Sequence, residues 1–416
     1  MAVEAARQAD ISDVNQVLFA TTSPPYAEKL NAATIHAALD LEGGTRAADL
    51  GDSTRSGLSA LCLAADSNAS TLVCMSDVIV GAPSGERESG GGDAAAAFVL
   101  GEGDGVARVL GLGARTEELL DTWRTPSQRF AKQWEPRFSE GILADQMHLA
   151  LSSALEQAGR SVADLTKVAA DSTNARAVRG FAKKLGLGPD QLGDNLAGTV
   201  GRCGAAHIGL MLANLLDEAS PGDLLAAVCG VDGAEAIVIE VTGGIVDSRP
   251  SRSVAHWIAS SNSALDYTRY LKWRGVLPFE APRRPDPARP AAPPMRRAER
   301  WKYAFVGSRC KSCGAGNLPP QRVCTMCKSI DQSEPEAYAS ATGKVATYTV
   351  DHLAYTLQPP VVAAVIDFDK GGRFTCQLAD ADPEKVAIGD ELEMTFRLLF
   401  TADGVHNYFW KARTLR

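Results

Sequence analysis

The sequence lacks any long apolar run. This absence and several others exclude whole classes of protein. No stretch approaches the roughly 18 consecutive apolar residues that a membrane-spanning helix needs. The opening segment, MAVEAARQAD, has neither a basic flank nor the apolar core of a signal peptide. Basic residues are not in excess, because 42 Lys and Arg stand against 50 Asp and Glu, for a net charge of −8. These absences predict a cytoplasmic protein that binds neither membranes nor nucleic acid.

The cysteines do not form the pattern of a disulfide framework. There are nine, an odd number, and they are unevenly placed. This distribution favours reduced thiols together with a metal site. With 416 residues, of which 45% are hydrophobic and 22% charged, the chain is long enough for two or three globular domains.

The first 245 residues alternate helix and strand signals. Residues 70–80 and 163–172 have the apolar composition of buried strands, and residues 144–159 and 207–219 have the periodicity of amphipathic helices. This alternation predicts an α/β fold in layers.

The same region contains an internal repeat. Residues 2–22 resemble residues 150–173, and residues 51–77 resemble residues 201–232. Each member of the second pair has a Gly-rich turn, a helix and a buried strand. Generic α/β alternation is the alternative, but the elements recur in the same order, which favours a duplication. We therefore predict a pseudo-duplicated, layered α/β/α core over residues 1–245.

Residues 246–300 have a different composition. A short aromatic helix beginning near Tyr267 precedes a segment rich in Pro and Arg, which we interpret as an extended linker. A basic linker is usually a solvated connector. The alternative is that some of its arginines bind phosphate groups. The candidates are Arg283, Arg284, Arg296 and Arg297.

Residues 301–416 form a third unit that opens with a metal-site pattern. Two C-x2-C turns can direct four thiolates at one ion, at Zn–S distances of about 2.3 Å, and leave no open coordination position. The pattern therefore predicts a structural Zn2+; a redox pair or unrelated cysteines are the alternatives. The four ligands would be Cys310, Cys313, Cys324 and Cys327. Four or five strand signals with Gly turns follow, and these predict a small Greek-key β-barrel.

The third unit resembles the small family that joins a rubredoxin-like zinc ribbon to an OB-fold. The resemblance is carried by SRCKSCG…LPPQRVCTMC, TGKVATYTV and DADPEKVAIGDELEMTF. It implies a zinc ribbon over residues 301–333 and an OB-fold over residues 334–416. Domains of this family commonly accompany acyl-CoA thiolases, synthases and aldolases and sit beside their acyl-CoA channel.

Residues 1–245 resemble the thiolase superfamily, most closely its hydroxymethylglutaryl-CoA synthase-like and ketoacyl synthase branches. The motifs that carry this resemblance are MAVEAARQA, VLFATTSPPYAEKLNAATIHAAL, GDAAAAFVLGEG and EASPGDLLAAVCGVDGAEA. The family usually has some tens of residues, including its first core strand, before the MAVEAAR helix. The resemblance therefore implies either an N-terminally truncated thiolase-like core or a strand supplied from elsewhere.

The resemblance does not extend to the family's catalytic residues. The nucleophilic Cys of the family falls on Thr54, in the turn GDSTRSG. Its first basic residue, a His, falls near Asp171, Ser172 or Thr173. Its second position, often Asn, falls near Arg202. At these three positions the sequence has none of the Cys, His and Asn residues that the family carries there.

Three other residues are candidates for catalysis. Cys203 and His207 lie four residues apart at a predicted helix start, where the helix dipole would favour a thiolate. Their alternative interpretation is a small turn residue and a packing histidine. Cys229 lies in VCGVDG, which resembles the late Cys-Gly turn of thiolases; its alternative interpretation is a structural thiol.

Together these patterns predict an accessory subunit of an acyl-CoA thiolase-, synthase- or aldolase-type complex, which makes or breaks a carbon–carbon bond next to a CoA thioester. Its partner would be a catalytic thiolase-superfamily subunit in a hetero-oligomer. The linker arginines would meet the CoA phosphates. Two alternatives stay open: a self-sufficient hydroxymethylglutaryl-CoA synthase-like acyltransferase with a displaced Cys, such as Cys203 or Cys229, and a nucleic-acid-binding OB module.

Overall fold

The chain forms two units. The computed structural model describes residues 1–262, 265–280, 287–354 and 356–415. What we call the N-terminal unit comprises Met1–Ala33 and Glu42–Ser263, and what we call the C-terminal unit comprises Thr34–Leu41 and Ala264–Arg416. The finer domain boundaries at residues 245, 300 and 333 remain predictions.

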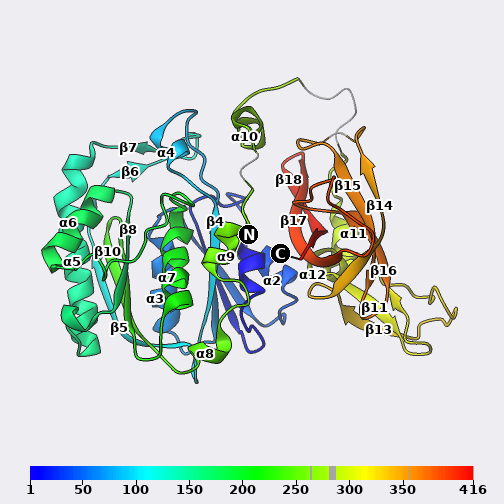
Figure 1. Cartoon of the computed structure of the whole chain (residues 1–416), viewed down its shortest axis with the longest axis horizontal. Coiled ribbons are helices and arrows are strands. Elements are labelled where there is room, and N and C mark those ends of the chain that lie inside the picture. The colour runs from blue at the N-terminus through cyan, green and yellow to red at the C-terminus, as the bar shows by residue number, and fades with distance from the viewer. Residues whose placement is uncertain (263–264, 281–286, 355, 416) are drawn as a thin grey trace. The chain divides into compact units, whose positions relative to one another are not determined.

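The N-terminal unit contains two mixed sheets (Figure 1). The first has the spatial order β2 (Arg46–Gly51), β1 (Gln16–Thr21), β3 (Thr71–Asp77), β4 (Ala94–Leu100). Its first three strands are parallel, and β4 is antiparallel to β3. Strands β1 and β3 are nearly continuous apolar runs, as expected for strands that are covered on both faces, whereas the edge strand β2 is largely exposed.

The second sheet repeats this plan. Its spatial order is β8 (Lys167–Ser172), β9 (Leu224–Gly230), β10 (Gly233–Val241), β5 (Ala107–Thr116). Strands β8 and β9 are parallel, β10 is antiparallel to β9, and β5 is antiparallel to β10. Beyond β8, Leu192 forms a single parallel bridge with Val168, at the position that β2 has in the first sheet. The predicted pseudo-duplicated α/β core is therefore confirmed.

Helices fill the layers around the two sheets. Helices α3 (Ser56–Ala65) and α7 (His207–Glu218) lie between the sheets and share one apolar core with both (Figure 1). Helices α5 (Pro136–Ala158) and α6 (Ala175–Leu185) pack on the other face of the second sheet. Proline at the first position starts α5, and Gly159, in the left-handed conformation (φ 62°), ends it.

Shorter elements complete the N-terminal unit. Helix α1 packs against β3 and β4. The 3-10 turn η2 precedes α7 and contacts β3. These and the other short elements are α1 (Ala2–Ala6), α4 (Glu86–Ser89), β6 (Thr122–Trp123), β7 (Lys132–Gln133), η1 (Val162–Asp164), η2 (Gly204–Ala206), α8 (Ile245–Ser248) and α9 (Val254–Ala259). Helix α2 (Ala32–Ala38) begins at the end of a segment of this unit, and its residues from Thr34 onward belong to the C-terminal unit.

The C-terminal unit begins with helices and a small sheet of order β12-β11-β13. All of its pairings are antiparallel. Helix α10 occupies the aromatic segment where a short helix was predicted. The elements are α10 (Tyr267–Trp273), α11 (Ala292–Arg297), α12 (Glu299–Ala304), β11 (Val306–Cys310), β12 (Gly316–Asn317) and β13 (Ser333–Ala337).

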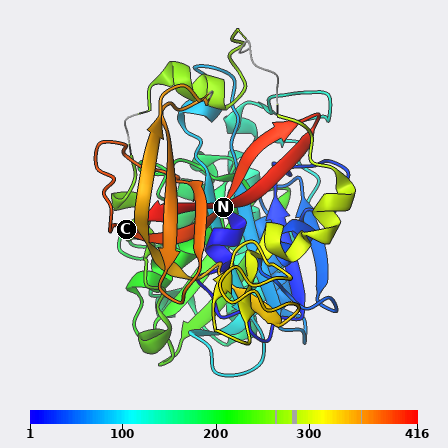
Figure 2. The same ribbon diagram turned by 90° about the vertical axis from the view of Figure 1, so that its right-hand side faces the viewer.

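A five-stranded antiparallel sheet of order β16-β15-β14-β17-β18 follows (Figure 2). Leu378, just after β16, forms a parallel bridge with Ala412 of β18, which brings the two outer strands together as in a partly open barrel. Phe305 and Trp410 stack in its core at a ring distance of 5.8 Å. The strands are β14 (Thr342–Asp351), β15 (Val361–Phe368), β16 (Arg373–Gln377), β17 (Glu391–Ala402) and β18 (Val405–Thr414). Across the described residues, no helix has the length and apolar character needed to cross a membrane.

Candidate functional site

The four predicted zinc ligands converge in the ribbon. Each Sγ atom lies within 4.8 Å of the other three. The Cys310 and Cys327 sulfur atoms are 3.7 Å apart, as are those of Cys313 and Cys324. A tetrahedral ion bound at about 2.3 Å would space its ligands by about 3.8 Å. The four sulfur atoms therefore fit a structural zinc ion.

Neighbouring polar groups lower the pKa of two of these sulfur atoms, those of Cys310 and Cys324. The Ser329 hydroxyl lies 3.2 Å from the Sγ atoms of both Cys310 and Cys327. That hydroxyl, followed by backbone N–H groups of the first turn, lowers the pKa of Cys310 to about 6. Backbone N–H groups of Cys327 and Met326 lower the pKa of Cys324. Since zinc binds the deprotonated sulfur, both effects favour the metal.

A buried amide fixes the second turn of the ribbon. The Asn317 side chain, 2% exposed, accepts hydrogen bonds from the Thr325 backbone N–H (3.0 Å) and hydroxyl (2.8 Å). Thr325 lies between the two cysteines of that turn. The sequence pattern predicted the four ligands but not the roles of Ser329 and Asn317. The only sign of these two residues in the sequence was their position close to the C-x2-C turns.

The turn before α3 in the N-terminal unit has the shape that places a reactive group at a helix start. Asp52 has a left-handed backbone (φ 75°), and Thr54 follows it, two residues before the helix begins. Gly57 is required here, because a Cβ at this position would collide with the carbonyl oxygen of Ala205. The start of α3 is thus pressed against η2 of the second half.

Arg55 ties this turn to the second half. Its guanidinium donates to the carbonyl oxygens of Arg115 (3.1 Å) and Asp232 (2.8 Å). These carbonyls belong to the end of β5 and to the residue that precedes β10. The position of Thr54 is therefore set by both halves of the duplicated core.

Asp77, at the end of β3, is the central polar residue of this region. It is 1% exposed and accepts six hydrogen bonds. Five come from the end of β1, and the sixth, of 2.6 Å, comes from the Ala205 backbone N–H. The five are donated by the Thr21 hydroxyl, the Thr22 N–H and hydroxyl, and the Ser23 N–H and hydroxyl. A buried carboxylate satisfied in this way holds the ends of β1, β3 and η2 together.

The two other positions carried over from the resemblance lie in contact with each other. Arg202 donates from Nη1 to the carbonyl oxygen of Ser172. The Ser172 hydroxyl in turn donates to the Gly230 carbonyl at 2.7 Å, and the Thr173 hydroxyl donates to Asp121 at 2.9 Å. An arginine and two hydroxyl residues therefore occupy the positions at which the resemblance implies a His and a second polar residue.

The candidate thiols and the candidate histidine are buried separately. Cys203 donates to the Gly201 carbonyl at 3.2 Å, and burial raises its pKa to about 12. Burial within β9 raises the pKa of Cys229 well above its usual value. His207 is 2% exposed, and its Nδ1 atom has no hydrogen-bond partner among the residues that the structure describes. No hydrogen bond joins His207 to either thiol in that part of the chain.

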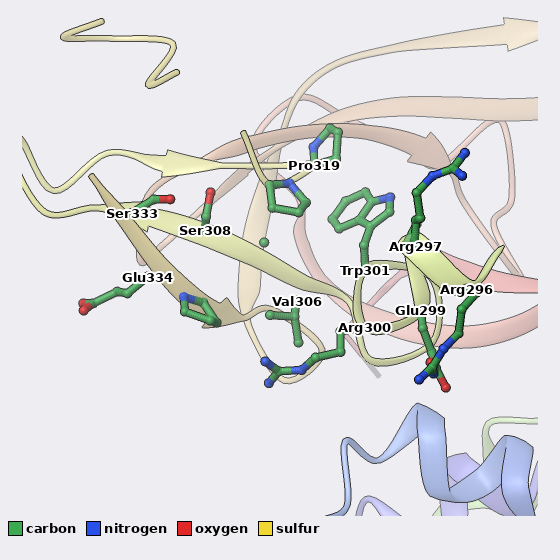
Figure 3. Close-up of a pocket in the computed structure, with 14 residues that line it drawn as sticks. Arg296, Arg297, Glu299, Arg300, Trp301, Val306, Ser308, Pro319, Ser333 and Glu334 are labelled. Atoms are coloured by element: carbon green, nitrogen blue, oxygen red, sulfur yellow. The ribbon is translucent and has the colours of Figure 1, made fainter. Parts of the chain in front are cut away.

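Two of the four candidate arginines line a cavity of the C-terminal unit, of about 940 Å³. Figure 3 shows Trp301 on its wall together with Arg296 and Arg297. Arg296 is paired with Glu299. Arg297 is exposed and has no ion pair within the described ranges. The other two candidates, Arg283 and Arg284, lie outside the described residues.

Comparisons with known proteins identify the C-terminal unit. Two family models match it: the rubredoxin-like zinc ribbon domain of ChsH2 over residues 302–330, and the C-terminal OB-fold domain of ChsH2 over residues 336–397. A DUF35 domain-containing scaffold protein of Methanocaldococcus jannaschii is 37% identical over 119 residues, which cover 27% of this chain and 84% of that protein. The chain belongs to the DUF35 family. The predicted zinc ribbon and OB-fold of this DUF35 protein are confirmed.

The N-terminal unit of the DUF35 protein is thiolase-like. A hydroxymethylglutaryl-CoA synthase of Aeropyrum pernix is 29% identical over 292 residues, which cover 67% of this chain and 81% of that enzyme. The solved structure of MvaS in complex with 3-hydroxy-3-methylglutaryl coenzyme A matches with a TM-score of 0.55 at 17% identity, over 69% of this chain and 81% of that one. At 17% identity, this structural match shows the fold alone. The chain thus joins a thiolase-like domain to a DUF35 domain.

Proposed function

We propose that this DUF35 chain is the accessory subunit of an acyl-CoA thiolase-, synthase- or aldolase-type complex. The complex makes or breaks a carbon–carbon bond next to a CoA thioester, and the partner is a catalytic thiolase-superfamily subunit. The observation that carries the proposal is Thr54, which stands before α3 where the resemblance calls for a cysteine.

The surroundings of Thr54 support a role without a nucleophile. A threonine hydroxyl needs a neighbouring base before it can attack a thioester. Among the described residues, Thr54 has no hydrogen bond to a histidine or a carboxylate. Arg202 cannot serve as that base, because a guanidinium group has N–H donors and no acceptor site. The raised pKa values of Cys203 and Cys229 keep both thiols protonated near neutral pH.

The named relatives support the substrate class and the scaffold role. The Aeropyrum relative is a hydroxymethylglutaryl-CoA synthase, and MvaS was solved with an acyl-CoA bound. The Methanocaldococcus relative of the C-terminal unit is described as a scaffold protein. A chain that carries both units would hold an acyl-CoA site next to a catalytic partner.

The cavity beside α11 is the proposed contact for the CoA phosphates. Arg297 offers an uncommitted guanidinium in the part of the chain described, and Arg296 and Arg300 line the same cavity. Guanidinium groups bind phosphate oxygens through paired N–H donors. The Trp301 indole on the wall offers an apolar surface to the rest of the nucleotide.

Incubation of the zinc-loaded chain with 14C-acyl-CoA tests the proposal. We expect no acyl label on the isolated chain after acid quench, and carbon–carbon bond chemistry only after a catalytic thiolase subunit is added. A hydroxylamine-sensitive thioester on the isolated chain would overturn the accessory role. Loss of that label in the Cys203→Ser or Cys229→Ser variant would then identify the displaced nucleophile.

A separate binding measurement tests the phosphate contact. Isothermal titration of the Arg297→Gln variant with CoA should show an affinity about five- to tenfold weaker than that of the unmodified chain. The matched control is Arg322→Gln, which removes an exposed arginine that is paired with Asp331 in the zinc ribbon. Equal affinities of all three proteins for CoA would rule out Arg297 as a phosphate ligand.

A further inference from the structure

The hairpin of β6 and β7 has a polar inner face that is fixed to the thiolase-like site (Figure 1). Thr122 lies opposite Gln133 in its register, and both side chains donate to the carboxylate of Asp121, at 3.2 and 3.3 Å. Asp121 is 4% exposed and also accepts from the Thr173 hydroxyl, while Gln133 donates to the Thr173 carbonyl at 3.3 Å. An isolated two-stranded hairpin is marginally stable at best. These contacts therefore hold the hairpin in place.

The outer face of the same hairpin is aromatic. Trp123 lies opposite Lys132 and, because side chains alternate along a strand, both project away from the inner face. The ring of Trp134 lies 6.1 Å from that of Trp123 and 5.8 Å from that of Phe138, which is in the first turn of α5. Trp134 is 48% exposed and Phe138 is 54% exposed. We call Trp123, Trp134 and Phe138 the aromatic row. Exposed aromatic side chains on a fixed element are typical of the centre of a protein interface.

Basic residues accompany the aromatic row. Residues 124–137 contain four basic residues and a single acidic one, Glu135, although acidic residues outnumber basic ones in the N-terminal unit as a whole. All four basic residues are exposed, and three of them, Arg124, Lys132 and Arg137, form no ion pair within the described ranges. The fourth, Arg129, lies over the ring of Phe130. An apolar centre with uncompensated positive charge around it is complementary to an acidic protein surface.

We propose that the aromatic row and these four basic residues form a docking face for the catalytic thiolase-superfamily subunit, which would contact it through an acidic surface with an apolar centre. This rests on the proposed function, because it assigns the contact of the partner named there. The inner face of the hairpin holds Thr173, so the docked subunit would be separated from the thiolase-like site by the hairpin alone. A second copy of the chain fits this face poorly, because a two-fold contact would place its basic residues against one another.

Biolayer interferometry tests the aromatic row, with the full, zinc-loaded chain immobilised and the catalytic thiolase subunit in solution. The Trp134→Ala and Phe138→Ala variants should each raise the Kd at least about tenfold, as truncation of an aromatic anchor does. The matched control is Leu149→Ala, at an apolar residue of the same helix as Phe138 that is 43% exposed. It should change the Kd less than about twofold. Because all three side chains are exposed, thermal unfolding should show the same melting temperature for the variants and the unmodified chain.

Charge reversal tests the basic residues. The Arg124→Glu/Lys132→Glu double variant should lower the association rate constant about tenfold or more at low ionic strength. It should also remove most of the salt dependence of association that the unmodified chain shows. The control Lys183→Glu makes the same kind of change at an exposed residue near the end of α6 and should leave association unchanged.

The outcomes separate this proposal from the proposed function. A complex that forms with the unmodified chain and tolerates every substitution in the docking face would overturn the docking face alone. If the unmodified chain forms no complex with the thiolase subunit, the proposed function and the docking face both fail. Light scattering and the anisotropy of a labelled single-stranded oligonucleotide test the other occupants. Loss of a homodimer or of oligonucleotide binding in Trp134→Ala would assign the face to a second copy or to nucleic acid and overturn the proposal.

Discussion

The zinc ribbon and the thiolase-like site are supported in the same way but present different groups at their centres. In the ribbon, the buried Asn317 and the Ser329 hydroxyl surround a complete set of four ligands. In the thiolase-like unit, the buried Asp77 supports a turn on which Thr54 replaces the expected cysteine. The supporting carboxylate has a structural role of its own, because it accepts six hydrogen bonds from the ends of two segments that are far apart in the sequence. A turn that carries a threonine is therefore held by buried polar support of the same kind as a turn that carries metal ligands.

Removal of zinc should have the largest effect on stability, and it should affect the C-terminal unit while leaving the N-terminal unit folded. Because zinc binding supplies much of the folding free energy of a small ribbon, a chelator or the Cys324→Ser variant should unfold the ribbon. Metal analysis should find about one zinc per chain before treatment and almost none afterwards. Hydrogen exchange should then rise in β11–β13 while β8 and β9 stay protected.

Cys376→Ser is the matched control for this experiment. Cys376 lies in β16, outside the ligand set. Its replacement should leave the zinc content unchanged. Retention of a full zinc equivalent by the Cys324→Ser variant would contradict the four-cysteine site.

The Asp77→Asn variant should lower the stability of the N-terminal unit. The amide of asparagine presents its own N–H groups to donors that now converge on a carboxylate, which leaves buried groups unsatisfied. We expect a loss of about 3–5 kcal/mol in the free energy of unfolding of the N-terminal unit, measured by urea denaturation. The zinc content should not change. Asp104→Asn, at an exposed loop position, serves as the control, and an equally small effect of both variants would remove Asp77 from its supporting role.

Thr54→Cys should restore a reactive thiol to the thiolase-like turn. Thr54 is half-buried at the N-terminal end of α3, where the helix dipole favours a thiolate. At pH 8 we expect iodoacetamide to alkylate the new thiol at least about tenfold faster than Cys203 or Cys229. Ser67→Cys places a comparably half-buried thiol at the opposite end of α3 and should react more slowly. Equal rates at the two ends of the helix would show that the turn no longer activates a thiol.

Glu336→Gln should have the smallest effect. Glu336 accepts from Arg309 (2.9 Å) and Lys370 (2.5 Å), and these contacts lower its pKa from 4.5 to about 2. A lowered folded-state pKa contributes stability that is complete above the unfolded pKa and is lost as the pH falls toward the folded one. At pH 7 the variant should lose about 1–2 kcal/mol.

The pH dependence of that loss checks its origin. The difference in unfolding free energy between the two proteins should be constant from pH 7 to about 5.5 and shrink below about pH 4.5. Acid release of zinc affects both proteins and cancels in this difference. The control Glu334→Gln, at a residue that is more than half exposed, should change little. A difference that does not vary with pH would assign the loss to packing.

Local signals in the sequence predicted much of the fold. The helix predicted over residues 207–219 extends over His207–Glu218, and the ribbon cysteines converge as their spacing indicated. The helix predicted over residues 144–159 begins earlier, at Pro136. Its first turns carry few apolar residues, so the apolar periodicity did not extend the prediction to them. The strand predicted over residues 163–172 starts at Lys167, because a capping box between Ser161 and Asp164 closes a 3-10 turn first.

The support of the thiolase-like site could not be predicted in this way. Asp77 is the last residue of an apolar strand, and in the sequence it has the appearance of a turn residue. Its donors come from the end of β1 and from Ala205, which are distant in the sequence and are assembled only by the folded sheet. The contact of Arg202 with Ser172 likewise joins the segment before η2 to the end of β8, and single-sequence patterns carry no information on such pairs.

The bond between Asp77 and Ala205 also has a consequence for synthesis of the chain. Its two ends are 128 residues apart. At a translation rate of about 5–20 residues per second, the acceptor would leave the ribosome about 6–25 seconds before its donor. During that interval the first half carries a carboxylate whose last partner has not yet been made. The first half of the core therefore matures only once the second half has been translated, and a chain that is arrested between them would be a natural substrate for chaperones.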